Sequence, residues 1–362
     1  MNGYIIVNAT ALKRSGGLTI LDQFIETIPV GKQEYVIFAN SEVNLSFPQN
    51  NITIVPKKIS SFFERFIWDT FGIKKWLQKN RIIPVATISL QNTNFRTKST
   101  IPNFIYFHNA IPFSDAGWNP LRKAERNLWF YKRIYPFFIR LYINKKTEVF
   151  VQSNSVRDGF AKCFNFPKDR IHIVLPKIKL EARMKSKYPT LDLNRLNLFY
   201  PATTFIFKNH STIIKAIGMM NEDLQQRITL HLTCLEDELP FKTSGSDTHF
   251  IINFLGKIDF SRVQQLYEEA DALLFPSYIE TLGLPLIEAA SIGMPIIASD
   301  LPYSREALRK YSGIKFVKYN DAVLWREEIL KLFSLKGHRY PPFSLGKSNS
   351  WKELFRIIES RI

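Results

Sequence analysis

The chain has 362 residues, more than one hydrophobic core usually supports, so two domains are expected. An apolar fraction of 45% and a charged fraction of 22% exclude a disordered polypeptide. The net charge of +17 is concentrated in residues 1–176, which hold 24 Lys and Arg against 11 Asp and Glu, and this predicts an anionic partner for that half.

Cysteine usage and hydropathy exclude further classes. Cys163 and Cys234 lie far apart, which excludes a disulfide framework or a CxxC metal site and favours a reducing compartment. We recognise no basic segment followed by an apolar segment, the pattern of a secretory signal peptide. No apolar run approaches the roughly 18 residues that a membrane-spanning helix needs. We expect a cytoplasmic protein, soluble or peripheral on the inner face of the plasma membrane.

Short apolar runs alternate with helical patterns through the first half. Residues 4–7 are predicted to form a strand, Gly16 and Gly17 a loop, and residues 18–27 a helix. Apolar strands that alternate with helices favour a parallel sheet covered on both sides, and so a Rossmann-like domain over residues 1–176. Its further strands are predicted at 35–38, 85–90, 104–108, 149–152 and 171–175.

The pattern breaks and then starts again. Residues 177–194 are charged, contain Pro189 and are predicted to be an interdomain linker. Residues 195–345 are predicted to form a second Rossmann-like domain. Its strands are expected at 196–200, 228–233, 249–254, 272–275 and 295–299, and its helices at 211–219 and 261–270.

The stretch from Asp271 to Asp300 is typical of one βαβ unit. An apolar strand leads through a loop into an apolar helix, with Pro285 suited to the first turn and Gly293 suited to the end of the helix. The loop therefore opens at the carboxyl edge of a parallel sheet, where ligands of open α/β folds bind.

That loop has the chemistry to hold a nucleoside diphosphate. The amides of Leu282, Gly283 and Leu284 are unpaired donors at the positive end of the helix dipole. Glu280 in the loop and Glu288 on the helix are carboxylates that accept from sugar hydroxyls. A lone carboxylate in such a place is more often a solvated charge, but this context favours a ligand site.

Glu280 and Glu288, seven residues apart in PSYIETLGLPLIEAASIGMPIIASD, resemble the E-x7-E motif of family 4 retaining glycosyltransferases with the GT-B fold. The resemblance implies two Rossmann-like domains whose parallel sheets face each other across a cleft, with a final helix, residues 350–362, packed back on the first domain. It implies that Glu288 binds the ribose, Glu280 the donor sugar and the 282–284 amides the diphosphate.

Two more segments of the second domain are similar to the same family. FLGKID, residues 254–259, resembles the base-binding turn, where the backbone near Ile258 would contact the nucleobase. YPATTFIFKNHSTIIKAI, residues 200–217, resembles the donor-phosphate segment and implies that Lys208 binds phosphate. On its own, Lys208 would be a surface lysine before a helix.

The first domain carries two matches. Gly16 and Gly17, after the first strand, resemble the glycine-rich loop that approaches the donor phosphates, although two glycines alone more often form a plain turn. His108 ends an apolar strand and resembles the histidine that the family places beside the donor sugar and the acceptor. A lone histidine is more often structural, but its place at the carboxyl end of a strand favours a site.

The chain also departs from the family pattern. Ala202 stands where the family usually has a phosphate-binding Arg, and Asn109 stands where an Asp often follows the histidine. Lys177 and Ile178 replace the usual Asn-Gly. The fold expectation survives these changes, but they leave the donor unidentified.

The resemblance implies a retaining, metal-independent enzyme of the hexosyltransferase type with His108, Lys208 and Glu280 as catalytic residues. Lys208 and the 282–284 amides would stabilise the charge on the leaving diphosphate. The departing phosphate oxygen would take the acceptor proton, and His108 would orient the sugar. No Asp-x-Asp pattern presents a metal site, so the donor nucleotide sugar is expected as a substrate with no metal and no cofactor.

The expected acceptor is a saccharide or a lipid-linked saccharide in cell-surface polysaccharide biosynthesis. Residues 57–76 and 122–146 combine Lys and Arg with Phe, Tyr and Trp, which suits an anionic membrane surface. The same aromatic residues would equally suit a protein core. Nucleic acid is not expected as a partner, because no recognition motif accompanies the charge.

Two other functions stay open. A sugar-nucleotide epimerase shares the architecture and needs no acceptor, and a non-catalytic membrane- or RNA-binding protein is compatible with the charge and with Ala202. A dinucleotide oxidoreductase is disfavoured, because no G-x-G-x-x-G follows the first strand.

Overall fold

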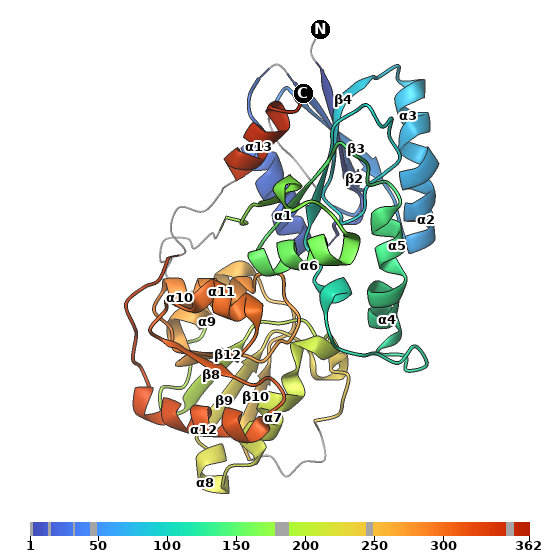
Figure 1. Cartoon of the computed structure of the whole chain (residues 1–362). Coiled ribbons are helices and arrows are strands. Elements are labelled where there is room, and N and C mark those ends of the chain that lie inside the picture. The colour runs from blue at the N-terminus through green and yellow to red at the C-terminus, as the bar shows by residue number, and fades with distance from the viewer. Residues whose placement is uncertain are drawn as a thin grey trace. The chain divides into compact units, whose positions relative to one another are not determined.

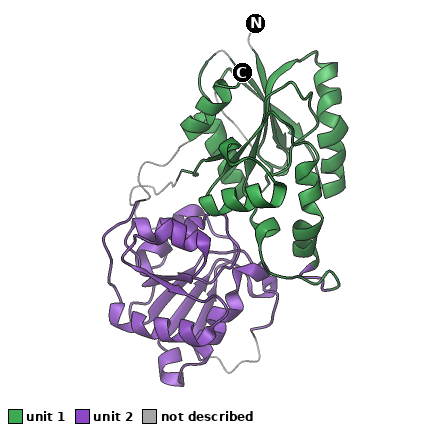
Figure 2. Cartoon of the chain, in the orientation of Figure 1, with its two compact units in different colours: residues 1–121, 126–177, 347–362 green, residues 122–125, 178–346 purple. Residues whose placement is uncertain are grey.

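The computed structural model describes residues 3–13, 16–31, 33–43, 49–177, 188–243, 249–344 and 351–362. The chain divides into two compact units (Figure 2). The first contains Met1–Leu121, Arg126–Lys177 and Lys347–Ile362, and the second contains Arg122–Glu125 and Ile178–Gly346. Of the predicted linker, residues 178–187 lie outside the described residues.

The first unit is built on a seven-stranded sheet in which all neighbouring strands are parallel. The spatial order is β3-β2-β1-β4-β5-β6-β7. The inner strands are almost completely buried, as expected where helices cover both faces. The strands are β1 (Tyr4–Ala9), β2 (Glu34–Asn40), β3 (Ile52–Lys57), β4 (Pro84–Ser89), β5 (Asn103–Phe107), β6 (Thr147–Val151) and β7 (Ile171–Ile173).

Helices cover both faces of this sheet (Figure 1). Successive strand residues point to opposite faces, so Ile5 and Val7 lie in one core and Ile6 lies in another. The first face carries α1 (Gly16–Thr27) and α13 (Trp351–Glu359). The helices associated with the other face are α2 (Phe62–Ile67), α3 (Ile73–Lys79), α4 (Arg126–Arg133), α5 (Tyr135–Arg140) and α6 (Asn154–Phe164), and the π-helical turn η1 (Trp68–Gly72) joins α2 to α3. Short 3₁₀ turns are η2 (Ile111–Phe113) and η3 (Lys168–Arg170).

Aromatic contacts hold α13 in the first unit. Trp351 stacks on Tyr106 with ring centroids 5.0 Å apart, and its indole N–H donates to Gln23 Oε1 at 2.8 Å. Phe355 packs on Phe24 at 5.2 Å. The end of the chain is therefore part of the same core as its beginning.

The second unit has a six-stranded sheet, also parallel, in the order β10-β9-β8-β11-β12-β13. Its strands are β8 (Leu196–Tyr200), β9 (Ile228–Leu232), β10 (Ile251–Phe254), β11 (Ala272–Phe275), β12 (Ile296–Ser299) and β13 (Ile314–Val317). Its α-helices are α7 (His210–Gly218), α8 (Glu222–Gln225), α9 (Phe260–Glu269), α10 (Leu284–Ser291), α11 (Pro302–Leu308) and α12 (Ala322–Leu332). Its 3₁₀ turns are η4 (Ile206–Lys208), η5 (Glu236–Glu238) and η6 (Phe333–Leu335).

Each sheet has one point where the strand order reverses direction. In the first sheet this switch lies between β1 and β4, and in the second it lies between β8 and β11. The connections after these neighbouring strands run in opposite directions, which opens a crevice at the carboxyl edge where ligands of such folds bind.

The structure changes three details of the expected elements. Gly16 and Gly17 were expected to form a loop, but they are the first two residues of α1. Strands β3 and β13 were not expected; both are edge strands with partly exposed, mixed sequences that weaken the apolar signal. In the described part of the chain, no helix has both the length and the apolar character needed to cross a bilayer.

Candidate active site

Two of the expected site residues meet at the switch point of the second sheet. Lys208 ends the 3₁₀ turn η4 that follows β8, and Glu280 lies in the loop between β11 and α10. Lys208 Nζ and Glu280 Oε1 are 2.5 Å apart, and the two side chains are only 16% and 14% exposed. They meet because β8 and β11 are neighbours, so their carboxyl ends share one edge.

The turn that carries Lys208 is held firmly. The hydroxyl of Tyr200 donates to the carbonyl of Lys208 at 2.7 Å. Asn209, with φ of 59°, donates its side-chain amide to the carbonyl of Pro276 at 3.2 Å and of Tyr319 at 2.7 Å. The turn after β8 is thereby tied to the loop after β11, which keeps the cation beside the carboxylate.

The N-terminus of α10 presents unpaired backbone donors. Gly283 precedes the helix with φ of 75°, a conformation that favours glycine. Pro285 lies in the first turn, as expected. No described acceptor pairs with the amides of Leu282, Gly283 or Leu284. The start of this eight-residue helix therefore has the donors and the dipole direction that suit an anion.

Glu288 is not a solvated helix residue. It lies in the second turn of α10, and its Oε2 accepts a 2.8 Å hydrogen bond from the hydroxyl of Tyr267 on α9. Burial raises the pKa of Glu288 above its usual range, and the bond from Tyr267 opposes that shift. The enclosed carboxylate keeps one oxygen on Tyr267 and offers the other as an acceptor.

The expected base-binding turn lies further along the same edge. Ile258 is partly exposed between β10 and α9, after Gly256 with φ of 61°. Strands β10 and β11 are three spacings apart in the sheet, about 14 Å. A ligand that contacts both Ile258 and Glu280 must therefore be extended along the edge of the sheet.

The remaining expected residues belong to the first unit. Gly16 and Gly17 open the twelve-residue helix α1, and a β-carbon at Gly16 would meet no heavy atom within 4 Å beyond its chain neighbours and its own helix. His108 follows β5, where its Nε2 lies 3.1 Å from the carbonyl of Leu90 and its backbone N–H donates to Asn92 Oδ1 at 2.6 Å. Burial lowers the pKa of His108, so its ring is neutral near neutral pH.

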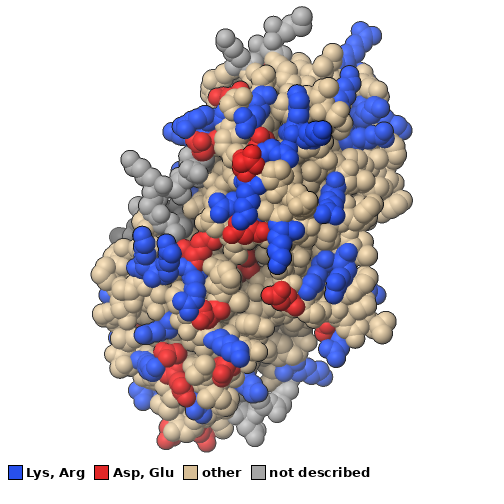
Figure 3. Space-filling model, viewed as in Figure 1, with Lys and Arg blue, Asp and Glu red and all other residues tan. Residues whose placement is uncertain are grey.

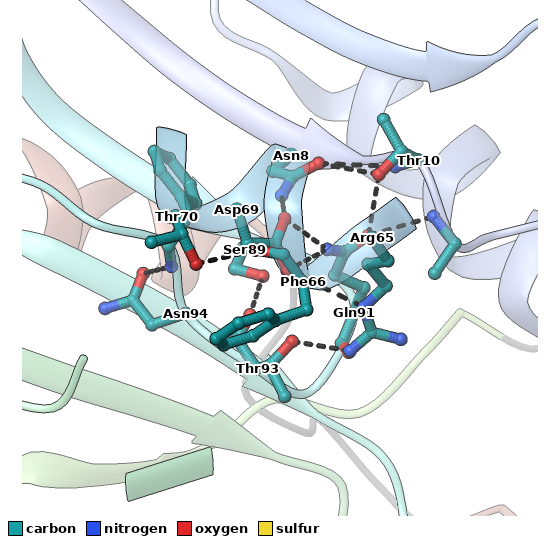
Figure 4. Close-up of polar contacts among 12 residues, drawn as sticks. Asn8, Thr10, Arg65, Phe66, Asp69, Thr70, Ser89, Gln91, Thr93 and Asn94 are labelled. Atoms are coloured by element: carbon teal, nitrogen blue, oxygen red, sulfur yellow. Dashed lines mark hydrogen bonds and ion pairs between the residues drawn. The ribbon is translucent and has the colours of Figure 1, made fainter. Parts of the chain in front are cut away.

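A buried polar network at the β1/β4 switch point was not anticipated from the sequence (Figure 4). Asp69, in the π-helical turn η1, accepts from Asn8 Nδ2 at 2.7 Å and lies 3.7 Å from Arg65 Nε. Arg65 donates to the carbonyl of Gln91, and the side chain of Gln91 accepts from the amide of Ala11 at 2.9 Å. The network therefore ties the loop after β4 to the loop after β1.

This network explains part of the basic, aromatic stretch 57–76. Arg65 and Asp69 are four residues apart on a helix, a spacing that puts both on one face. That spacing is the only feature of the local sequence that indicates the network, because Asn8 and Gln91 reach Asp69 solely through the order of the strands. Burial raises the pKa of Asp69 to about 7.

Ala202 is buried and offers no charge, so Lys208 is the cation that the 200–208 segment contributes. Within the described ranges, no cluster of three or more His, Cys, Asp or Glu side chains is arranged to hold a metal ion.

Comparison with known sequences finds relatives that match this chain over part of its length. Residues 187–340 match the family model for glycosyl transferases group 1. The chain is 24% identical over 208 residues to the O-antigen chain mannosyltransferase RfbU of Salmonella typhimurium, covering 57% of each chain. It is 26% identical over 162 residues to the O-antigen chain mannosyltransferase B of Escherichia coli, covering 41% of this chain and 42% of that one. The chain thus spans about half the length of the curated relatives it matches.

Solved structures share the fold. WaaG, a glycosyltransferase involved in lipopolysaccharide biosynthesis, aligns with a TM-score of 0.68 and 12% identity over 91% of this chain and 90% of that one. HepE of Anabaena, solved in complex with UDP and glucose, aligns with a TM-score of 0.59 and 11% identity over 99% of both chains. The chain therefore carries a glycosyl transferases group 1 domain in residues 187–340 and has the GT-B fold of two Rossmann-like units.

Proposed function

We propose that the protein is a retaining, metal-independent glycosyltransferase of the hexosyltransferase type. It transfers a sugar from a nucleoside diphosphate sugar to a saccharide or lipid-linked saccharide. The observation that carries this proposal is the pairing of Lys208 with Glu280 beside the N-terminus of α10. A cation, unpaired amides and a carboxylate on one sheet edge are the groups that a leaving diphosphate and a sugar require.

Each group of the second unit has a proposed role. Lys208 and the 282–284 amides stabilise the negative charge that develops on the leaving diphosphate. Glu280 accepts from hydroxyls of the donor sugar, and Glu288 accepts from the ribose. The backbone near Ile258 contacts the base, which agrees with the extended ligand that the strand spacing requires.

The roles of the first unit rest on the family resemblance. The amides at Gly16 and Gly17, which open α1, approach the donor phosphates. His108, neutral at physiological pH, orients the sugar and is not the base. The acceptor hydroxyl attacks the same face of the anomeric carbon that the diphosphate leaves, and the departing phosphate oxygen takes its proton, so the anomeric configuration is retained. The scheme uses no metal and no cofactor, because Lys208 and the amides supply the positive charge.

The proposed substrates are inferred from the proteins that this chain resembles. HepE was solved with UDP and glucose, and RfbU is an O-antigen chain mannosyltransferase. They support a nucleoside diphosphate hexose as donor, and as acceptor a saccharide or lipid-linked saccharide of a cell-surface polysaccharide. An anionic membrane on the cytoplasmic side is the proposed second partner, and nucleic acid is not.

Thermal melting with UDP, GDP and dTDP and their sugars tests the proposal. One nucleotide should raise the melting temperature, corresponding to about 2.7 kcal/mol at a hundredfold excess over the Kd. Lys208→Met should abolish most of that shift, while Lys310→Met, an exposed lysine of the same unit, should not. A chain that no nucleotide stabilises would contradict the proposal, and an epimerised donor formed without acceptor would favour the epimerase.

A further inference from the structure

An open groove of about 570 Å³ lies in the first unit beside the end of β3. One wall is a helical face that runs from α2 into α3, on which Trp68, Gly72 and Trp76 recur every four residues. The other wall includes the end of β3 and the two residues after it. The charged residues that line the groove are four lysines and one glutamate: Lys57, Lys58, Lys75, Lys79 and Glu64.

Among the described residues, no carboxylate forms an ion pair with a lysine of this groove. Glu64 Oε2 accepts from the backbone of Ser60 at 2.8 Å. Lys57 Nζ lies 4.7 Å from the ring centroid of Trp68. Basic side chains gather over the region of α3 in Figure 3. An anion is therefore the ligand that this groove favours.

The Trp68 side chain, which lines the groove, carries an unsatisfied donor. The indole N–H of Trp68 is buried and has no hydrogen-bond partner among the described residues. A β-carbon at Gly72 would overlap the Trp68 ring, so glycine is what lets the ring lie against the helix. Because this N–H is closed to solvent, it is an unsatisfied polar group of the wall and does not itself contact a ligand in the groove.

An apolar stripe continues from the groove. Phe63, Ile67 and Phe71 are 69%, 43% and 48% exposed, at four-residue spacing on the same helical stretch. Ile67 also lines the groove, so the stripe and the lysines are contiguous. Lysines beside exposed aromatic residues on a helix match the boundary between headgroups and acyl chains.

We propose that this groove binds the headgroup phosphate of an anionic phospholipid in a bilayer, while Phe63, Ile67 and Phe71 enter the acyl-chain region. The inference rests on the proposed function for the membrane partner and assigns that partner to α2–α3. The stretch 122–146 is the weaker candidate, because Tyr135 and Ile139 on α5 are buried in the core.

The test is flotation of the full chain with vesicles, without any nucleotide sugar. The protein should bind vesicles that contain phosphatidylglycerol and not vesicles of phosphatidylcholine alone. Lys57→Gln/Lys75→Gln should weaken binding about 30-fold, since each lysine near an anionic surface contributes roughly fivefold. Lys98→Gln/Lys162→Gln removes the same charge from exposed positions of the same unit and should weaken it less than about threefold.

The stripe is tested at constant charge. Phe63→Ser/Phe71→Ser should weaken binding at least about tenfold. Val323→Ser/Ile251→Ser, at positions 42% and 48% exposed in the second unit, should not.

Four results would overturn the inference. The first two are equal losses of vesicle binding in the two lysine double variants and no vesicle binding by the wild type. The other two are release of the protein from vesicles by millimolar glycerol 3-phosphate and a dimer, formed without vesicles, that Phe63→Ser/Phe71→Ser dissociates. Vesicle binding needs no donor. A failure of nucleotide binding would therefore contradict the proposed glycosyl transfer and leave the lipid site standing, whereas a failure of vesicle binding would contradict the membrane partner and leave the proposed glycosyl transfer standing.

Discussion

The hydroxyl of Tyr267 donates a 2.8 Å hydrogen bond to Glu288, the carboxylate in the second turn of α10. The bond lowers the pKa of Glu288, but burial raises it more, so the net shift is upward. The protein therefore encloses a carboxylate whose ionised form is only partly compensated. This is expected of a residue kept for a ligand, because stability alone would favour a neutral side chain there.

Glu288→Gln is expected to stabilise the protein while weakening nucleotide binding. The folded-state pKa of Glu288 lies above its unfolded value of ~4.3, so the stability it contributes is present below ~pH 4 and lost as the pH rises through the raised pKa. The glutamine side chain does not ionise, so the variant does not lose stability in this way. Urea titrations should show an advantage of the variant that grows above ~pH 4.3 and then levels off, whereas exposed Glu327→Gln should show none. An advantage that does not change with pH would contradict this account.

Gly283→Ala is expected to destabilise the protein by about 1–2 kcal/mol, because a β-carbon disfavours the positive φ of 75° at this position. The new β-carbon would also lie 3.1 Å from Leu286 Cδ1 and 3.3 Å from Tyr303 Cε2. The nucleotide-induced melting shift should fall as well, since the amides before α10 must move. Gly218→Ala, at the end of α7 in open space, is the control and should raise stability by up to about 1 kcal/mol. Equal effects of the two changes would rule out this role for Gly283.

His108→Ala is expected to lower turnover roughly 100-fold through misplacement of the sugar, with nucleotide binding largely kept. Because burial lowers the pKa of His108, wild-type activity should show no loss from this ring as the pH falls past ~6.5. The folding stability that the neutral ring contributes is present above ~6.5 and lost as the pH falls through the lowered pKa. A turnover loss no larger than that of exposed His249→Ala would refute the role.

Asp69→Asn is expected to remove a pH dependence of stability. Burial raises the pKa of Asp69 to about 7, so its contribution to the unfolding free energy should decline between ~pH 4 and about pH 7 and then level off. The limiting slope is ~1.4 kcal/mol per pH unit. Chemical unfolding across this range should show a steeper decline in the wild type and in exposed Asp237→Asn than in Asp69→Asn, where the decline due to Glu288 remains. An unchanged slope in Asp69→Asn would assign the whole decline to other groups.

Much of the candidate site was predictable because its signals are local. The loop and helix from Phe275 to Ser291 carry Glu280, Gly283 and Glu288 within one βαβ unit, and the turn type and helix start follow from Gly and Pro. The network of Asn8, Arg65, Asp69 and Gln91 was missed. Its members come from three segments that meet only through the strand order, and no pattern within one segment indicates that contact.

The sequence by itself determined the alternation of strands and helices, the two Rossmann-like units and the helix start at Gly283 and Pro285, since these depend on patterns within about twenty residues. The tertiary structure alone decided that Lys208 meets Glu280 across 72 positions of the chain. It also decided that the hydroxyl of Tyr267 on α9 donates to Glu288 on α10. These contacts depend on which strands are neighbours and which helices cover them, and that order is a property of the whole packed core.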